Sequence, residues 1–373
     1  MNQIPKPSPR LLHIDWARGL AVLWMIRGHV IDAFLGPAGR QSQLFHFWQM
    51  LGAYTAPAFL FLAGLSVGLS YAKIDQMDIP FGKRLWFSTR RGLEVLGIAY
   101  LFRLEEFLQW VPYSKWRDIL RFDILNNIGI SLILVGLLFA VIKKNHLRYW
   151  ALAATAILVA LLSPAVWSSP LVNSLPWYIR NFFNASVGFG YFPLFPYFVF
   201  VPAGAMAGLL TRRFRGDKLK LIFLHYGLIA AGMLLMLGGI WAAVSIPHSH
   251  GWILFYNSPE YSFIRIGMQA VVLSGCFFLC LLFKPESFSF MRLMGRHSLM
   301  VYWVHIALVY GRLTSGLQRN LDWPQAILAL ILTVALMVLL AWAVENWARI
   351  RPRLSFPRLR AAALQRAGTK HAK

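Results

Sequence analysis

Apolar runs recur along the whole chain, and short polar or charged segments separate them. Ten runs are long enough, or nearly long enough, to cross a membrane as helices. They cover residues 12–35, 53–71, 85–107, 124–142, 149–166, 192–211, 221–246, 265–283, 298–310 and 326–347. The ninth run is short, and we expect its helix to continue to about Leu317. The pattern predicts an all-α membrane protein, a polytopic bundle of about ten transmembrane helices.

The first predicted helix carries polar side chains at depths where lipid disfavours them. On a 3.6-residue period, one stripe of this helix holds Asp15, Arg18, Val22, Met25, His29 and Asp32. At 1.5 Å per residue, His29 lies about 16 Å deeper than Arg18, near the middle of a hydrocarbon core about 30 Å thick. An ionisable group at this depth usually faces the bundle interior and has a partner, for which Asp32 is the local candidate. The stripe serves either helix packing or, as we favour, a reactive imidazole in a polar tunnel.

The ninth predicted helix has a similar polar face. The residues on this face, at steps of four, three and seven, are Ser298, Tyr302, His305 and Arg312. His305 lies nine residues past Arg296, about 14 Å deep, so its depth is comparable to that of His29. This geometry is expected of two helices that line one polar cavity.

Two further segments combine small or polar residues with a helix start. The run from Thr55 to Ser70 contains Pro57, which can start or kink the helix, and small residues that allow close packing, which are Gly64, Ser66, Gly68 and Ser70. The fourth predicted helix begins with a polar cluster, which consists of Arg121, Asp123, Asn126 and Asn127. Asp123 is a candidate N-cap there, which is a sufficient structural role. The outward loops combine aromatic and polar side chains, a pattern that suits either a sugar-binding surface or an interfacial aromatic belt.

Composition agrees with a membrane protein. Hydrophobic residues make up 58% of the chain and the mean hydropathy is +0.55, whereas soluble domains contain about 45–50% apolar residues. Cys276 and Cys280 lie one turn apart inside a predicted span, where we expect two small buried residues rather than a metal site or a disulfide. The N-terminal segment lacks a small-residue cleavage site, so we expect the first helix to be retained.

The net charge of +23 invites a nucleic-acid hypothesis, but the positions of the charges disfavour it. Most of the 37 lysines and arginines fall in segments on one side of the predicted bundle. The positive-inside rule then places both termini in the cytoplasm and accounts for most of the net charge. We expect residues 1–348 to form one transmembrane domain and residues 349–373 to form a basic cytosolic tail.

Taken in order, the four segments resemble the transmembrane acyltransferases related to the heparan-α-glucosaminide N-acetyltransferase catalytic domain. The first helix is similar to D-x-x-R-G-x-A-x-x-x-M through Asp15, Arg18, Gly19, Ala21 and Met25. The second is similar to P-x-F-x-F-x-x-G through Pro57, Phe59, Phe61 and Gly64. The third segment matches the family through Arg121, Asp123, Ile124, Leu125, Asn126, Ile128 and Gly129. The last is similar to G-R-[N/H]-S-L-x-V-Y-x-x-H through Gly295, Arg296, His297, Ser298, Leu299, Val301, Tyr302 and His305.

The resemblance implies acyl transfer across a membrane, from acetyl-CoA or another acyl-CoA to an amine or hydroxyl, commonly on a glycan. The lysosomal branch of the family keeps its key histidine in the loop after the first helix, where this chain offers His46. Both His29 and His46 are therefore candidates for that role.

The residues suit this chemistry in their own right. A histidine, at position 29, 46 or 305, could act as a base or accept the acyl group, and Asp32 could fix its tautomer. Tyr302, Asn126 or an arginine could stabilise developing negative charge. The candidates for binding CoA phosphates are Arg18, Arg296, Arg212 and Arg213, although Arg212 and Arg213 would look the same if they only obeyed the positive-inside rule. The candidates for binding the acceptor are Arg121, Asp123 and Asn126. We expect no metal, because no metal-ligand spacing occurs.

The sequence thus predicts an acyl-CoA-dependent acyltransferase of a bacterial inner or plasma membrane. Its acceptor would be an extracytoplasmic glycan or a similar molecule, and the protein could form a homo-oligomer. The alternative is a carrier for a glycan, lipid or small metabolite in which His29, Asp32 and His305 form a substrate or proton site. A carrier tends to show a two-fold internal repeat with interrupted helices at matching positions. We find no such repeat, which favours the enzyme.

Overall fold

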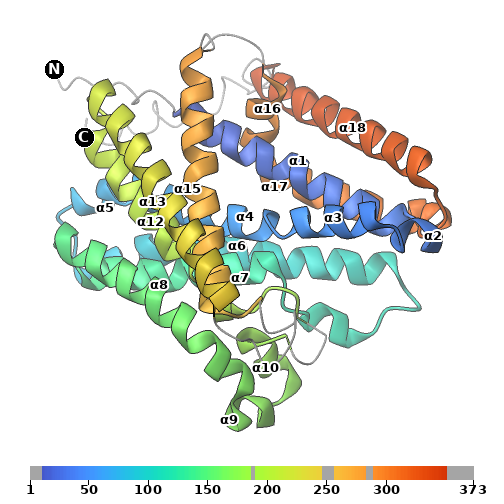
Figure 1. The fold of residues 1–373 in the computed structure, drawn as a ribbon, viewed down its shortest axis with the longest axis horizontal. Helices are drawn as coiled ribbons and strands as arrows, with labels where there is room; N and C mark the ends of the chain where they lie inside the picture. The colour runs from blue at the N-terminus through green and yellow to red at the C-terminus, as the bar shows by residue number, and fades with distance from the viewer. Residues whose placement is uncertain (1–10, 186–189, 246–255, 283–288, 351–373) are drawn as a thin grey trace, which may run out of the picture.

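The computed structural model describes residues 11–185, 190–245, 256–282 and 289–350, and within these ranges the chain folds into helices without a β-sheet (Figure 1). Most of the expected basic tail, residues 351–373, lies outside the described residues. The longer helices are α1 (Leu12–Phe34), α4 (Thr55–Ser70), α6 (Phe81–Gln109), α7 (Ile124–Val141), α8 (Asn145–Ser168), α12 (Phe200–Phe214), α13 (Lys218–Ser245), α15 (Pro259–Leu282), α17 (Ser298–Val309) and α18 (Trp323–Ile350). The shorter elements are α2 (Pro37–Arg40), α3 (Gln43–Gly52), α5 (Ala72–Asp75), η1 (Trp116–Leu120), α9 (Pro170–Ser174), α10 (Trp177–Phe183), α11 (Leu194–Tyr197), α16 (Phe290–Arg296) and η2 (Arg312–Leu317).

Each of the ten predicted spans falls on one of the longer helices. Among the described residues, seven helices are long and apolar enough to cross a membrane, with α3 and α4 taken together as Gln43–Ser70 and α11 and α12 together as Leu194–Phe214. The remaining predicted spans correspond to α1 and α6, which carry several charged residues, and to the short helix α17. The all-helical fold is therefore confirmed. Of the ten predicted spans, seven meet the criteria of length and composition for crossing a membrane among the described residues.

The ninth predicted helix ends earlier than expected. α17 stops at Val309, and the chain continues as the separate 3-10 helix η2 instead of an α-helix that reaches Leu317. The hydroxyl of Thr314 donates to the carbonyl of Leu308 (2.5 Å) and to that of Val309 (3.3 Å). These bonds occupy carbonyl groups that a continuing helix would use, so they close the last turn of α17.

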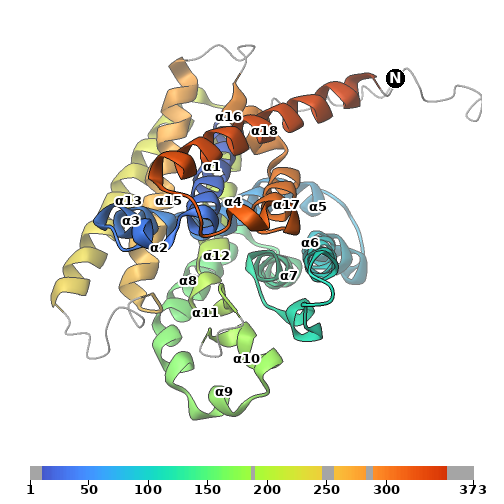
Figure 2. The same ribbon diagram turned by 90° about the vertical axis from the view of Figure 1, so that its right-hand side faces the viewer.

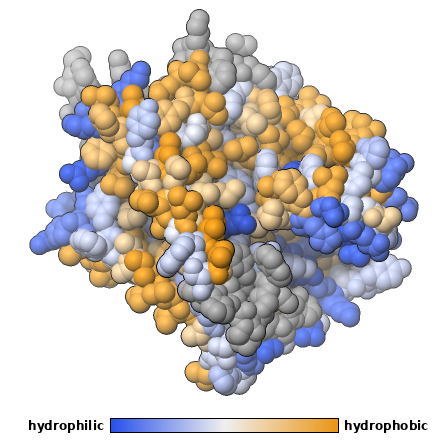
Figure 3. Space-filling model, viewed as in Figure 1, coloured by the Kyte–Doolittle hydropathy of each residue, from blue (hydrophilic) through white to orange (hydrophobic). Residues whose placement is uncertain are grey.

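Large apolar side chains cover the outside of the bundle. Leu234 and Trp241 of α13 are each 72% exposed, and Leu332 of α18 is 60% exposed. In Figure 3, hydrophobic side chains spread across much of the visible face, and hydrophilic ones gather toward its left and right edges. Such a surface is expected where the surrounding solvent is lipid hydrocarbon.

Helices α4 and α12 touch backbone to backbone. A Cβ atom added to Gly64 would collide with the carbonyl of Val201, and one added to Gly204 would collide with that of Phe61. One turn further along, Gly68 lies against the carbonyl of Ala205 in the same way. The prediction that small residues of this helix allow close packing is confirmed for these glycines.

Helix α1 lies at the centre, among α4, α15, α17 and α18 (Figures 1 and 2). Gly19 of α1 contacts the backbone of Met291, and Gly295 contacts the carbonyl of Asp15. The residue number rises from 291 to 295 along α16 while that of its contact on α1 falls from 19 to 15, so α16 runs antiparallel to α1. The chain turns at His297, and α17 then returns alongside α1.

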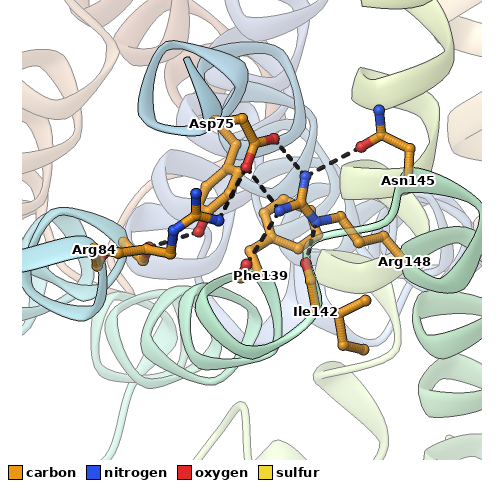
Figure 4. A network of polar contacts seen from close by, with 8 residues as sticks. Asp75, Arg84, Phe139, Ile142, Asn145 and Arg148 are labelled. Atoms are coloured by element: carbon orange, nitrogen blue, oxygen red, sulfur yellow. Dashed lines mark hydrogen bonds and ion pairs between the residues drawn. The ribbon is translucent and has the colours of Figure 1, made fainter. Parts of the chain in front are cut away.

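A completely buried arginine fixes the ends of α7 and α8 (Figure 4). Arg148 donates to both carboxylate oxygens of Asp75, at 2.5 and 2.8 Å, and to the carbonyls of Phe139 and Ile142, at 3.2 and 2.6 Å. Its guanidinium also lies 4.8 Å from the centre of the Tyr71 ring. The buried charge is therefore fully compensated, and it joins the segment after α4 to two other helices.

Candidate active site

A large cavity lies between α1, α4, α6, α7 and α17, with a volume of about 1840 Å³. Small-molecule pockets are usually about 300–1,000 Å³, so this one has room for two sizeable ligands at once. Its lining residues come from both ends of these helices, which gives the cavity two chemically different ends.

The end beside the start of α1 is lined by three arginines, which we call the basic end: Arg18, Arg91 and Arg296. Arg18 donates to the hydroxyl of Ser66 at 2.5 Å, so Ser66 does more than allow close packing. Arg91 forms an ion pair with Glu94 at 3.2 Å, and Arg296 forms one with Glu345 at 2.8 Å. These partners hold the guanidinium groups at the rim, where they can bind an anionic ligand.

The opposite end is lined by four carboxylates, and we call it the carboxylate end: Asp32, Glu105, Glu106 and Asp123. Two arginines line it as well. Arg103 forms ion pairs with Glu106 and Asp123, and Arg121 lies 3.7 Å from Glu106 and 3.4 Å from Asp118. The two ends of the cavity therefore carry opposite charge.

Two histidines from different helices meet beside the cavity. Nδ1 of His29, on α1, lies 2.9 Å from Nε2 of His305, on α17. Nδ1 of His305 lies 2.7 Å from the carbonyl oxygen of Val301. His29 lines the cavity, whereas His305 is completely buried behind it. The expected meeting of these two helices is thus confirmed.

The hydrogen bonds define the tautomers of the two neutral imidazoles. A carbonyl oxygen can only accept, so Nδ1 of His305 carries the proton and its Nε2 is the acceptor. Nδ1 of His29 must then donate to that Nε2, which leaves the lone pair of the His29 imidazole on its own Nε2. Nε2 of His29 is therefore the basic atom of the pair, the one that is available to accept a proton or an acyl group.

Asp32 does not hold His29 as the sequence suggested. Its carboxylate instead accepts from Arg40, at 2.8 and 3.1 Å, and from the hydroxyl of Tyr310, at 3.2 Å. The tautomer of His29 is set by His305 and Val301, on the neighbouring helix. Local spacing along α1 favoured Asp32, but the turn after α1 brings Arg40 back to bind it.

His46 lies outside the cavity. It sits on an exposed position of α3, and its Nδ1 is 2.9 Å from the carbonyl oxygen of Ser42. Of the three candidate histidines, only His29 lines the cavity.

Tyr302 also lines the cavity, with its ring centre 6.0 Å from that of His305. Asn126 does not line the cavity and is 1% exposed. Its side-chain oxygen accepts from the backbone N–H of Asp123 at 3.1 Å, and the Asp123 carboxylate bonds the start of α7 in return. This capping box confirms Asp123 as the N-cap, and it leaves Asn126 with a structural role instead of a place at the cavity.

Arg212 and Arg213 lie away from the cavity. Arg212 donates to the carbonyl of Leu69 at 3.0 Å, at the end of α4, and Arg213 is exposed with its guanidinium near the Phe214 ring. The sequence missed Arg91, Glu105 and Glu106, all on α6. Two adjacent acidic residues near the end of the third predicted span were the signal for the two glutamates.

A family model for the catalytic region of heparan-alpha-glucosaminide N-acetyltransferase matches residues 10–256, more than half of the chain. The match includes His29 and the segments of α1, α4 and α7 that carry the resemblance, and it ends before Gly295–His305. No curated protein matches the chain. The family and the apolar helices identify an integral membrane protein with an acetyltransferase-like function. The chain belongs to the heparan-alpha-glucosaminide N-acetyltransferase catalytic-domain family.

Proposed function

We propose that this protein transfers an acyl group, acetyl in the simplest case, from acyl-CoA in the cytosol to a hydroxyl or amine of an extracytoplasmic glycan or similar acceptor. The observation that carries the proposal is the free Nε2 of His29 on the wall of a cavity whose two ends are oppositely charged. A carrier would need a polar path, but it would not need a histidine with a fixed basic atom.

The basic end suits the donor. Arg18, Arg91 and Arg296 provide the positive charge that the phosphates of CoA require. CoA holds its thioester at the end of a long, narrow arm, and Arg18 is separated from His29 by about 16 Å of helix. An anchored CoA would therefore present its thioester close to the imidazole.

The orientation follows from the same charges. Basic residues accumulate in the segments at the donor end, which the positive-inside rule places in the cytoplasm with both termini. The carboxylate end then faces the outside, in a bacterial inner or plasma membrane. The acceptor enters from there and meets the thioester at His29.

At His29 the reaction needs one proton to be taken up and then released. Nε2 of His29 takes the proton of the acceptor hydroxyl or amine as the acceptor attacks the thioester carbonyl carbon. The new C–O or C–N bond forms, the C–S bond breaks, and the departing thiolate recovers the proton from His29 as free CoA. His305 keeps its bond to Nδ1 of His29 throughout and stabilises the transient imidazolium. We assign donation to the developing oxyanion to the hydroxyl of Tyr302, because this residue lines the same cavity.

The test uses purified protein in nanodiscs with radiolabelled acetyl-CoA, with and without a glycan panel. We expect thiol release and labelled glycan from the wild type and from the control His46→Ala, and at least a hundredfold loss in His29→Ala. Label on the wild-type protein that disappears in His29→Ala would instead identify an acyl-histidine. If no acyl donor is bound or cleaved, the acyltransferase proposal fails and the carrier becomes the better explanation.

A further inference from the structure

The arginines at the carboxylate end are already bound to carboxylates. Arg103 is shared by Glu106 and Asp123, and Arg121 is shared by Glu106 and Asp118. Arg40, just outside the cavity lining, is bound to Asp32. The carboxylates that bind these arginines line the cavity themselves, apart from Asp118, whereas Asp15, Glu94 and Glu345, which pair with the arginines of the basic end, do not line it. A ligand at the carboxylate end therefore meets acidic groups directly.

Glu105 differs from the other carboxylates of this end. It lines the cavity, and its hydrogen-bond donor is the neutral side-chain amide of Gln109. Among the described residues that line this end, four carboxylates accompany two arginines, so the lining has a formal excess of negative charge. Two further basic residues on this side are engaged elsewhere: Arg117 lies over the Trp177 ring, and Arg180 donates to the carbonyl of Asn173.

Aromatic rings accompany the carboxylates. Trp110, Tyr191 and Tyr256 line the same cavity near the carboxylate end. Rings offer apolar faces for the C–H surfaces of a sugar, and carboxylates accept hydrogen bonds from its hydroxyl groups. A sulfate, phosphate or carboxylate group would instead face like charge in a partly desolvated site, which is strongly unfavourable.

We infer that the acceptor is a sugar that presents hydroxyl or ammonium groups but no anionic group to this end, and that Glu105 sets this charge preference. The inference rests on the proposed acyltransferase function, and it narrows the acceptor class. In this role Glu105 binds the acceptor and acts on its specificity, while His29 carries out the transfer.

The test compares one disaccharide in three forms: unmodified, 6-amino and 6-sulfated. For the wild type we expect kcat/KM for the unmodified and amino forms to exceed that for the sulfated form at least tenfold, with a smaller ratio at high salt. Glu105→Gln should reduce this ratio at least threefold, and Glu105→Lys should reduce it further. Asp78→Asn, which removes an exposed carboxylate just before α6 and outside the cavity, is the control and should leave the ratio unchanged.

Direct binding of the three disaccharides, measured calorimetrically in nanodiscs without acyl-CoA, separates this inference from the proposed function. The same ranking in binding supports the inference even where no transfer occurs. Equal or tighter binding of the sulfated form, a ratio unchanged by Glu105→Gln, or no binding of any form would overturn it.

Discussion

The imidazole rings of His29 and His305 lie nearly parallel, at 12°, and are joined by a 2.9 Å hydrogen bond between α1 and α17. The two residues are 276 positions apart in the chain, yet one sets the tautomer of the other. The hydrogen bonds of the pair therefore run one way: His29 donates to His305, and His305 donates to the carbonyl of Val301. The basic nitrogen of the pair is on His29.

We expect His305→Ala to lower kcat about 10- to 100-fold and to leave KM for acetyl-CoA unchanged, because His305 orients His29 without touching substrate. The double variant with His29→Ala should be no slower than His29→Ala alone, since both changes disable one unit. Steady-state kinetics of the three variants test this. Independent, multiplicative losses would show that His305 has a separate role.

Removing the rim charges should weaken donor binding. Arg296→Gln and Arg91→Gln are each expected to raise KM for acetyl-CoA about 5- to 10-fold with little change in kcat, because each contributes a charge-assisted contact to CoA. Arg213→Gln, an exposed arginine away from the cavity, is the control. An equal effect of all three substitutions would point to a general surface potential instead of a binding site.

Loss of Arg148 should destabilise the fold. Arg148→Met leaves Asp75 with Arg84 as its remaining ion-pair partner and leaves the Ile142 carbonyl without this donor, at a cost of about 3 kcal/mol. We expect a clearly lower midpoint in thermal unfolding followed by fluorescence. Arg148→Lys should recover little of the loss, because an ammonium group cannot reproduce the forked contacts to Asp75. Full recovery by lysine would mean that charge alone matters.

The Tyr71 ring lies under Arg148 and also lines the cavity, so a kinetic effect should accompany the loss of stability. Arg148→Met should raise KM for acetyl-CoA at temperatures where the variant remains folded. An unchanged KM would show that the network supports the helices without shaping the cavity.

Gly64→Ala should reduce the yield of folded protein and destabilise it by about 1–3 kcal/mol, because the new Cβ collides with the Val201 carbonyl. Gly97→Ala provides the matched control, since no atom lies within 4 Å of an added Cβ there. That change should be neutral or slightly stabilising, as alanine favours helix over glycine. Size-exclusion profiles and unfolding midpoints of the two variants decide the matter; similar profiles would contradict the packing argument.

The sequence predicted the helices well, because apolar runs report burial in lipid directly. It also predicted that the helices of His29 and His305 meet, since ionisable groups are costly within a membrane and usually have a partner. It did not predict that Asp32 binds Arg40, because that contact depends on the path of the chain after α1.

The residues that line the cavity were harder to predict. Arg91 lines the cavity and Arg213 does not, yet both belong to basic segments on the same side of the membrane. Whether each arginine faces the cavity depends on the rotation of its helix about the helix axis, and tertiary packing sets this rotation. Asn126 was a candidate because it belongs to the polar cluster at the start of the fourth predicted helix, but its side chain completes a capping box.

The contacts between α4 and α12 restrict how this protein can move. Where two backbones touch, neither helix can slide or roll past the other without a carbonyl striking a Cα, so the pair behaves as one rigid wall. Glycine contacts between α6 and α7, at Gly92 and Gly129, make the opposite wall equally stiff. The seam where α17 meets α1 is held differently, because it is bridged by the histidine pair. If this seam opened far enough to admit a ligand from the side, the two imidazoles would separate and His29 would lose its partner. A ligand could therefore not enter by that route while His29 is held in its reactive form.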